Sequence, residues 1–367
     1  MIIHYFINSF FPEMKIANSR KKPFQKRHFY SKIPFFGTQI KRIGMNRILS
    51  LLIIGTLPLL SNAQELSIST APGSNVTLEA SINGSGIQIL EMDGTEIFGA
   101  DYSVSANDPS IAVYPLADGS FIVRENIANF LVYDSFGKVQ RSISNSTQSE
   151  GGEAISELAM DGNGKTVVVY NPKVMTNGVE GSRGKIISGS GPVMDVFYSQ
   201  DRALSHVEVS ANGEFIAFVS AKEGSDDEVQ LMDRFGNMLV TISFDQSVKG
   251  VSFSENGLYV AIYSGGRAAA YQVRSGERVG STSFRNTSVV FAGYDPVDKT
   301  IIGLTGSGSS TLTEVQLHAV NVSARKIARE NSNESFNIVS QVSMERVGSG
   351  RYKIKGLDKE ITLRASF

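Results

Sequence analysis

The sequence lacks two residue types entirely, because its 367 residues include no cysteine and no tryptophan. Without cysteine no disulfide can form, so the folded chain has to be held together by its hydrophobic core. Histidine is almost absent after residue 63, where only His206 and His318 occur. Two isolated histidines cannot supply the clustered ligands of a zinc site. Long amphipathic helix patterns are also missing, and this absence predicts an all-β protein.

The N-terminal part differs in composition from the rest of the chain. Residues 1–44 carry nine basic residues and one acidic residue. From Met45, a short basic segment, the apolar run Ile48–Leu60 and the small residues Ser61–Ala63 follow one another in the order of a secretory signal peptide. The apolar run has 13 residues. A membrane-spanning helix needs roughly 18 or more.

We therefore predict that translation starts at Met45 and that residues 1–44 are a disordered, over-extended start. Residues 45–63 are then a signal peptide that is removed on export. The mature chain begins at Gln64, and because this residue is not a cysteine, a lipoprotein anchor is excluded at that site. The alternative is a basic cytoplasmic tail ahead of an uncleaved anchor.

The basic residues of the segment 1–63 conceal the acidic net charge of the remaining chain. The full sequence has 35 basic and 36 acidic residues, and residues 1–63 hold ten of the basic residues and one of the acidic ones. Residues 64–367 therefore carry 25 basic and 35 acidic residues, a net charge of −10. Surfaces that bind nucleic acid need patches of Lys and Arg, so we expect no nucleic-acid partner.

A tight-turn motif recurs along residues 64–367. In most copies a Gly with Asn or Asp precedes a short run rich in Val, Ile and Phe. This chemistry favours β-hairpins, because Gly and Asn tolerate positive φ. The copies begin at Ala117, Asp161, Ala211 and Glu255, and weaker ones begin at Pro296 and Val347. A period between 20 and 50 residues is typical of repeats that stack to bury a common core.

A second turn, built around an aspartate, alternates with the first. Asp134 and Asp233 each stand two residues before a Phe-Gly pair. We predict that their carboxylates cap these turns. The strongest repeat, Val207–Phe244, contains both turns and four strand-like runs. Period and content together predict a β-propeller of about seven four-stranded antiparallel blades, with six or eight as alternatives.

The predicted blades cover residues 64–367 as one β-propeller domain. The third blade has an apparent insertion, Asn171–Arg183, between its second and third strands. The last blade has strand-like sequence for only three strands. We place the blades near residues 65–100, 104–144, 154–199, 204–244, 248–284, 288–330 and 336–367.

The strongest repeat resembles a known kind of propeller. Ser210–Ser220, SANGEFIAFVS, is similar to the S-P-D-G-x-x-I-A-F-x-S core of the WD40-like repeats of bacterial periplasmic proteins, the type found in TolB. The similarity continues into Val229–Asp233 and is weaker over Val251–Gly280. Ala211 replaces the usual proline, and no Trp-Asp pair ends any strand. The resemblance implies the propeller fold and a bacterial, exported protein.

Few residues are suited to catalysis. Sialidase-like and quinoprotein propellers carry tryptophan motifs that this chain cannot form. His206 and His318 are expected to be packed or rim residues, and Gly303–Ser309 lacks the Lys-Ser/Thr ending and the helix of a phosphate-binding loop. We predict no catalytic residue, metal or cofactor. The alternative is a lactonase-like propeller hydrolase that uses carboxylates of the central channel and a divalent cation.

Binding is the favoured function. Loops that join second to third strands, or one blade to the next, emerge on one face of a propeller and tend to form its ligand surface. The most charged of these loops is Ala221–Glu228. The candidate binding residues are Arg124, Glu125, Lys222, Glu223, Asp226, Asp227 and Arg267.

The sequence thus predicts a periplasmic or secreted β-propeller that acts as a non-catalytic scaffold for protein interaction or ligand binding. Its partner is expected to be another periplasmic, outer-membrane or extracellular protein. No transmembrane segment is expected after cleavage of the signal peptide.

Overall fold

The computed structural model describes residues 64–66, 79–83, 86–90, 96–100, 112–116, 118–188, 193–284 and 288–365. Every element of regular secondary structure in these residues is a β-strand, which confirms the predicted all-β class. Residues 1–44 and 45–63, assigned above to an over-extended start and a signal peptide, lie outside this part of the chain. Within the described part no helix is long and apolar enough to cross a membrane.

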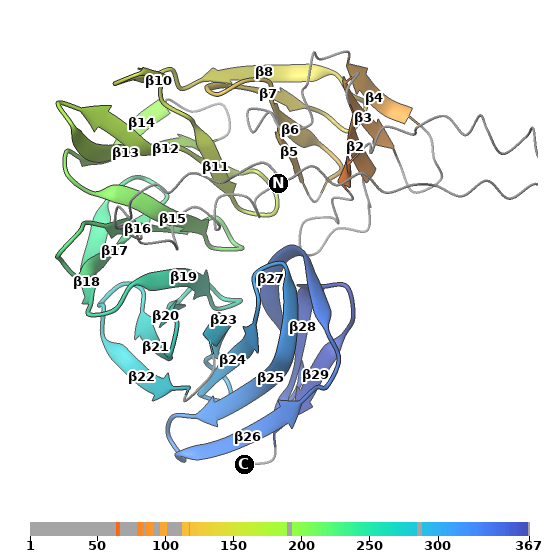
Figure 1. Ribbon diagram of the computed structural model, residues 1–367, viewed down its shortest axis with the longest axis vertical. Coiled ribbons are helices and arrows are strands. Elements are labelled where there is room, and N and C mark those ends of the chain that lie inside the picture. The colour runs from red at the N-terminus through yellow and green to blue at the C-terminus, as the bar shows by residue number, and fades with distance from the viewer. Residues whose placement is uncertain are drawn as a thin grey trace, which may run out of the picture. The chain divides into compact units, whose positions relative to one another are not determined.

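The strands follow one another in antiparallel sheets of consecutive strands (Figure 1). Sheet 1 contains β1 (Gln64–Leu66), β2 (Glu79–Asn83), β3 (Gly86–Leu90) and β4 (Glu96–Ala100). Sheet 2 contains β5 (Ala112–Pro115), β6 (Phe121–Arg124), β7 (Asn129–Tyr133) and β8 (Val139–Ser144). Sheet 3 contains β11 (Glu157–Met160), β12 (Thr166–Thr176), β13 (Val179–Ser188) and β14 (Val193–Ser199). A small ribbon of β9 (Gln148–Ser149) and β10 (Gly152–Glu153) precedes sheet 3.

The second half of the chain continues the pattern. Sheet 4 contains β15 (Ala203–Val209), β16 (Phe215–Ala221), β17 (Asp227–Asp233) and β18 (Met238–Phe244). Sheet 5 contains β19 (Val248–Phe253), β20 (Tyr259–Ser264), β21 (Arg267–Gln272) and β22 (Arg278–Ser283). Sheet 6 contains β23 (Ser288–Asp295), β24 (Thr300–Ser307), β25 (Thr311–Asn321) and β26 (Lys326–Asn331). Sheet 7 contains β27 (Phe336–Gly348), β28 (Arg351–Leu357) and β29 (Ile361–Arg364).

This arrangement confirms a propeller of about seven blades, six with four strands and the last with three. Sheets 6 and 7 are joined at one corner, where Thr311 and Leu312 of β25 pair with Asn337 and Phe336 of β27. The apparent insertion Asn171–Arg183 is a continuation of the β12–β13 hairpin, whose register shifts between Asn171 and Val174.

The turns form through the residues that the repeat predicted. Gly213 has a φ of 69°, and the Asn212 side-chain oxygen accepts hydrogen bonds from the Ser210 hydroxyl and the Glu214 N–H. Ser254, Asn256 and Gly257 repeat this geometry between β19 and β20. The predicted aspartate caps are also confirmed. Asp233 Oδ1 accepts from the N–H groups of Phe235 and Asn237, both at 2.9 Å, and Asp134 caps its own turn in the same way.

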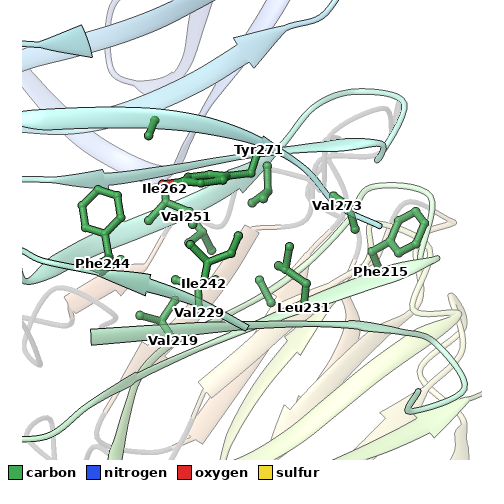
Figure 2. Packing of buried hydrophobic residues seen from close by; sticks show 14 residues of the cluster. Phe215, Val219, Val229, Leu231, Ile242, Phe244, Val251, Ile262, Tyr271 and Val273 are labelled. Carbon is green, nitrogen blue, oxygen red and sulfur yellow. The ribbon is translucent and has the colours of Figure 1, made fainter. Parts of the chain in front are cut away.

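Sheets 3 to 6 each bury both faces against the sheets before and after them. Because side chains alternate along a strand, Ile216 and Phe218 of β16 pack with sheet 3, whereas Phe215, Ala217 and Val219 pack with sheet 5. Figure 2 shows the second of these layers, in which Val219, Leu231 and Ile242 of sheet 4 lie opposite residues of sheet 5 such as Ile262. Similar layers join sheets 2 and 3, 5 and 6, and 6 and 7.

Burial falls from the second strand of a sheet to the fourth. All but the last residue of β16 and of β24 are buried. In β22 and β26, the fourth strands of sheets 5 and 6, no residue is buried. The stability of the fold therefore comes mainly from apolar contacts between neighbouring sheets, and less from contacts within one sheet.

Replacing Phe218 with Ala tests this dependence. Phe218 is fully buried and stacks on Phe197 of sheet 3 with ring centroids 5.0 Å apart. We expect Phe218→Ala to lower the free energy of unfolding by about 3–5 kcal/mol, because it leaves a cavity between two sheets. Phe235→Ala, at a residue that is 63% exposed, is the matched control and is expected to cost less than about 1 kcal/mol. Equal losses in urea unfolding would contradict this account.

Candidate functional site

Every sheet presents two ends. We call "turn end" the end with the hairpins that join first to second and third to fourth strands. The "loop end" holds the connection from second to third strand and the link to the next sheet. Turn ends of successive sheets adjoin, since the Thr166 hydroxyl donates to the Gly213 carbonyl at 2.8 Å and the Asn212 amide donates to the Asn256 carbonyl at 3.3 Å. The predicted ligand loops belong to the loop end.

The predicted loop Ala221–Glu228 is held in place by Arg202, from the link between sheets 3 and 4. The Arg202 guanidinium donates to the Ser220 hydroxyl at 3.1 Å and to the Asp226 carbonyl at 2.5 Å. It also lies 3.4 Å from the Glu228 carboxylate. These contacts tie both ends of the loop to one cation and fix its conformation.

Lys222 and Glu223 lie on the exposed outer part of this loop. The Lys222 ammonium pairs with the Asp201 carboxylate at 2.5 Å. This hydrogen bond is the main cause of the lowered pKa of Asp201. Both Lys222 and Asp201 are about half exposed, so their pair contributes little to stability.

A small hollow lies beside the loop. Its volume is about 140 Å³, and it is lined by Ser225, Asp226, Asp227, Phe244, Asp245, Gln246 and Ser247. The structure therefore brings together two candidates from Ala221–Glu228 and the link from β18 to β19. Arg267 contacts two of the lining residues, since its guanidinium pairs with Asp245 at 2.8 Å and lies 5.1 Å from the centre of the Phe244 ring.

Asp227 is the buried member of this group, with 8% of its surface exposed. One of its carboxylate oxygens accepts the Val248 N–H at 2.8 Å. Burial raises the pKa of Asp227, although this hydrogen bond and the nearby Arg202 oppose the rise. The hollow is lined by three acidic residues, Asp226, Asp227 and Asp245, of which Asp245 already pairs with Arg267.

Arg124 and Glu125 belong to another sheet. Arg124 ends β6, is 4% exposed, and donates to the Ser156 carbonyl at 2.8 Å. It also pairs with Glu157 of β11 at 2.9 Å. Its contacts therefore join sheet 2 to sheet 3. Neither Arg124 nor Glu125 lines the hollow at Asp227.

The two histidines have different surroundings. His318 is buried and its Nε2 lies 3.0 Å from the Thr305 hydroxyl, with the Phe284 ring against it. Burial lowers the pKa of His318 to about 4, so its ring is neutral at pH 7. His206 is partly exposed and lies 3.3 Å from the Glu208 carboxylate. Among the described residues no three His, Asp or Glu side chains form a group that could hold a metal ion.

The turn end has a different surface, which is marked by exposed apolar residues. Of the eleven large apolar residues that are exposed in the described part of the chain, nine lie at the turn end and two at the loop end. The turn-end residues are Phe136, Val139, Val193, Phe235, Met238, Leu258, Val297, Ile327 and Val347. Phe136 and Phe235, which are 87% and 63% exposed, occupy the tips of the aspartate-capped turns.

Sequence reasoning missed Arg202 and Asp245 at the loop end and the apolar residues at the turn end. Asp245 stands in a link between successive blades, so the rule applied to the other loops also covers it. A phenylalanine in the middle of a polar turn, as in Asp233-Arg-Phe-Gly, is a comparable signal. Arg202 gave no signal, because its contacts depend on the packing of two sheets.

Comparison with solved structures places the fold among WD40 propellers. One similar structure is KlAtg21 in its complex with the coiled coil of AgAtg16 (TM-score 0.54, 10% identity), which covers 80% of this chain and 95% of that one. Another is the C-terminal WD40 domain of Sif2 (TM-score 0.52, 10% identity), with 79% and 78% covered. No protein-family profile and no curated protein matches the sequence.

These similarities confirm the WD40-like β-propeller fold that the repeat predicted. At 10% identity they show the fold alone. Membership of the bacterial TolB type stays a prediction.

The buried charge of Asp227 gives a pH-dependent prediction. Asp227→Asn keeps an oxygen for the Val248 N–H but removes the buried charge, so we expect a higher free energy of unfolding at pH 7. Because the native state raises the pKa of Asp227, native protein takes up the proton more readily than unfolded protein. The parent therefore gains stability relative to the variant as pH falls from neutral through this pKa, and the difference shrinks.

Urea unfolding at pH 7 and at about pH 5 measures this difference. Asp226→Asn, at the exposed neighbouring residue, is the control and is expected to change the pH dependence less. A gap between Asp227→Asn and the parent that widens on acidification would contradict the assignment.

Proposed function

We propose that this chain, which has the WD40 propeller fold, is an exported, non-catalytic scaffold that binds another protein through its turn end. One observation carries the proposal. Nine of the eleven exposed large apolar residues in the described part of the chain lie at the turn end, although both ends are built from short polar connections.

Physical chemistry favours a protein partner for such a surface. Exposed apolar residues that occur singly need no explanation, but their concentration on one part of a surface is typical of interaction sites. Aromatic side chains are the commonest anchors of protein interfaces. Phe136 and Phe235 fit this role, because their turns are held by backbone hydrogen bonds to Asp134 and Asp233 and so lose little freedom on binding.

The hollow at the loop end is the proposed second contact. Asp245 pairs with Arg267 there, and a Lys or Arg side chain of a partner is the group that best offsets the charge of Asp226 and Asp227. Lys222 and Glu223 belong to the same exposed loop as Asp226 and Asp227, and Arg267 pairs with Asp245 of the hollow. The complex of KlAtg21 with a coiled coil is an example of a protein of this fold with a protein partner.

Export is part of the same proposal and rests on the pattern of residues 45–63. The exported product is expected to begin at Gln64, and N-terminal sequencing of the secreted or periplasmic protein measures this directly. A product that keeps residues before Gln64 would contradict cleavage at this site.

Affinity capture with surface variants tests the proposed binding surface. The tagged, exported chain and its Phe136→Ser/Phe235→Ser variant serve as baits for cell-envelope extract. We expect the variant to lose the captured partner by at least about tenfold, because two aromatic anchors are removed. The control is Val179→Ser/Tyr198→Ser, which removes the two exposed apolar residues of the loop end and is expected to keep the partner.

Both variants change exposed residues, so their thermal unfolding is expected to match that of the parent within about 2 °C. Equal capture by both variants would place the binding surface elsewhere. A chain that captures nothing but hydrolyses lactone or ester substrates when divalent cations are added would contradict the scaffold and favour the enzyme.

A further inference from the structure

A hairpin at the turn end of sheet 6 holds a basic residue in an unusual backbone conformation. Arg325, between β25 and β26 (Figure 1), has a φ of 54°. In sheet 5 the residue at the same distance from the end of the third strand is Gly276, with a φ of 68°. Glycine adopts positive φ readily, whereas a residue with a Cβ does so at a cost in free energy. Arg325 therefore stands where glycine would strain the backbone less.

The first hairpin of sheet 6 repeats this feature. Lys299, between β23 and β24, has a φ of 49°. In the first hairpins of sheets 2, 3, 4, 5 and 7, the residue with positive φ is a glycine, namely Gly119, Gly164, Gly213, Gly257 and Gly350. The other two described non-glycine residues with positive φ, Asn177 and Glu314, lie outside the turn end. At the turn end, sheet 6 is thus the one described sheet in which basic residues take these positions.

The two hairpins of sheet 6 are in contact. The Val322 N–H donates to the Lys299 carbonyl at 3.0 Å. The side-chain amide of Asn321 donates to the Asp298 carbonyl at 2.8 Å. Lys299 and Arg325 are both exposed, so these adjoining turns present two cations to the solvent.

Sheet 5 adds a cation on one side of these hairpins. The Val322 side chain lies so close to β22 that a Cβ on Gly280 would be 2.6 Å from it. Arg278 begins β22 two residues before Gly280 and is exposed. Lys326, which directly follows Arg325, is exposed as well. The basic surface therefore extends from sheet 6 to the adjoining edge of sheet 5.

Sheet 7 continues the basic surface on the other side. The Gly350 N–H donates to the Asp298 carboxylate at 2.8 Å, so the start of β28 adjoins the Lys299 hairpin. Arg351 follows Gly350, is exposed, and lies opposite Arg364 of β29. These two arginines and the two lysines of β28 alternate with the buried residues of these strands and form the basic face of sheet 7.

The exposed cations of this region have no counter-charge. We call "basic corner" the residues Arg278, Lys299, Arg325, Lys326 and Arg351, none of which forms an ion pair with a described residue. The carboxylates of the first hairpin of sheet 6, Asp295 and Asp298, pair with Arg346 at 3.0 and 3.3 Å. The corner stays net positive when the exposed Glu277 beside it is included. Like charges gathered in this way repel one another, so an anionic partner would stabilise them.

Exposed apolar side chains lie among these cations. Val297 shares a hairpin with Lys299, and Ile327 directly follows Lys326. An acidic protein segment with apolar side chains can contact both kinds of residue, whereas a phosphate-rich polymer or surface matches the charges alone. Residues 64–367 have a net charge of −10, which also disfavours an extended phosphate surface.

We propose that the basic corner is the docking site for an acidic segment of the protein partner, with Lys299 and Arg325 as its central cations. This inference rests on the proposed binding through the turn end and adds the charge of the segment that binds there. Strained backbone positions are concentrated at binding sites and active sites, where function retains residues that the fold alone does not favour. Lys299 and Arg325 fit this description.

Asparagine variants of the full chain test the docking site. Asn tolerates positive φ, so Lys299→Asn/Arg325→Asn removes two charges, and its thermal unfolding temperature is expected to be no lower than that of the parent. The control is Lys138→Asn/Lys165→Asn, which removes two exposed lysines from turn-end hairpins of sheets 2 and 3. Both variants change the net charge by the same amount.

The probe is a fluorescein-labelled peptide of four Asp-Leu-Glu repeats, and a peptide of four Ser-Leu-Ser repeats serves as its neutral counterpart. Fluorescence anisotropy at about 0.1 M NaCl measures the affinities. We expect the parent and the control variant to bind the acidic peptide equally and the neutral peptide much more weakly. Lys299→Asn/Arg325→Asn is expected to bind the acidic peptide at least about tenfold more weakly than the parent.

Three results would overturn the inference. The first is a parent that does not bind the acidic peptide, or equal affinity in all three proteins. The second is a parent that binds vesicles of phosphatidylglycerol but not the peptide, which would favour a membrane surface. The third comes from capture with cell-envelope extract. If Phe136→Ser/Phe235→Ser loses the captured partner and Lys299→Asn/Arg325→Asn keeps it, the proposed scaffold stands and the acidic docking site fails.

Discussion

The apolar layer between successive sheets is the interaction on which the rest of the structure depends. A sheet such as β15–β18 has two apolar faces, and it cannot shield both without a neighbour on each side. The second strands, β16 and β24 among them, are therefore the most buried, and the fourth strands the most exposed. Repetition of one unit follows from this constraint, because every added sheet covers one face and leaves another.

The same constraint decides where function can lie. Side chains between sheets pack against one another and are not accessible to a partner. Arg124, His318 and Asp161 are also buried, and their hydrogen bonds stabilise the fold. The two ends of the sheets remain free for a partner. Their surfaces differ, since the turn end presents Phe136 and Phe235 and the loop end presents an acidic hollow.

Short sequence motifs predicted the turns, which are formed by residues close to one another in the chain. Asn212–Gly213 and Asp233 could be assigned to turns because a turn is formed by residues close in sequence. The loop at Asp227 could be proposed from its charge, but the hollow could not, because Asp245 reaches it from another connection. Phe235 was interpreted as part of a turn, and its exposure depends on the surroundings. The basic face of sheet 7 requires strand register, which composition does not contain.

Hydrogen–deuterium exchange of the folded chain tests the stacking of sheets most directly. If apolar layers on both faces hold the structure, the backbone N–H groups of β16, β20 and β24 exchange slowest, and those of β18, β22 and β26 exchange much faster. The comparison is made only between N–H groups that are hydrogen-bonded within a sheet, because alternate N–H groups of the edge strands β18, β22 and β26 point away from their own sheet and exchange fast whatever packs on them. Uniform exchange across the strands of each sheet would contradict the account.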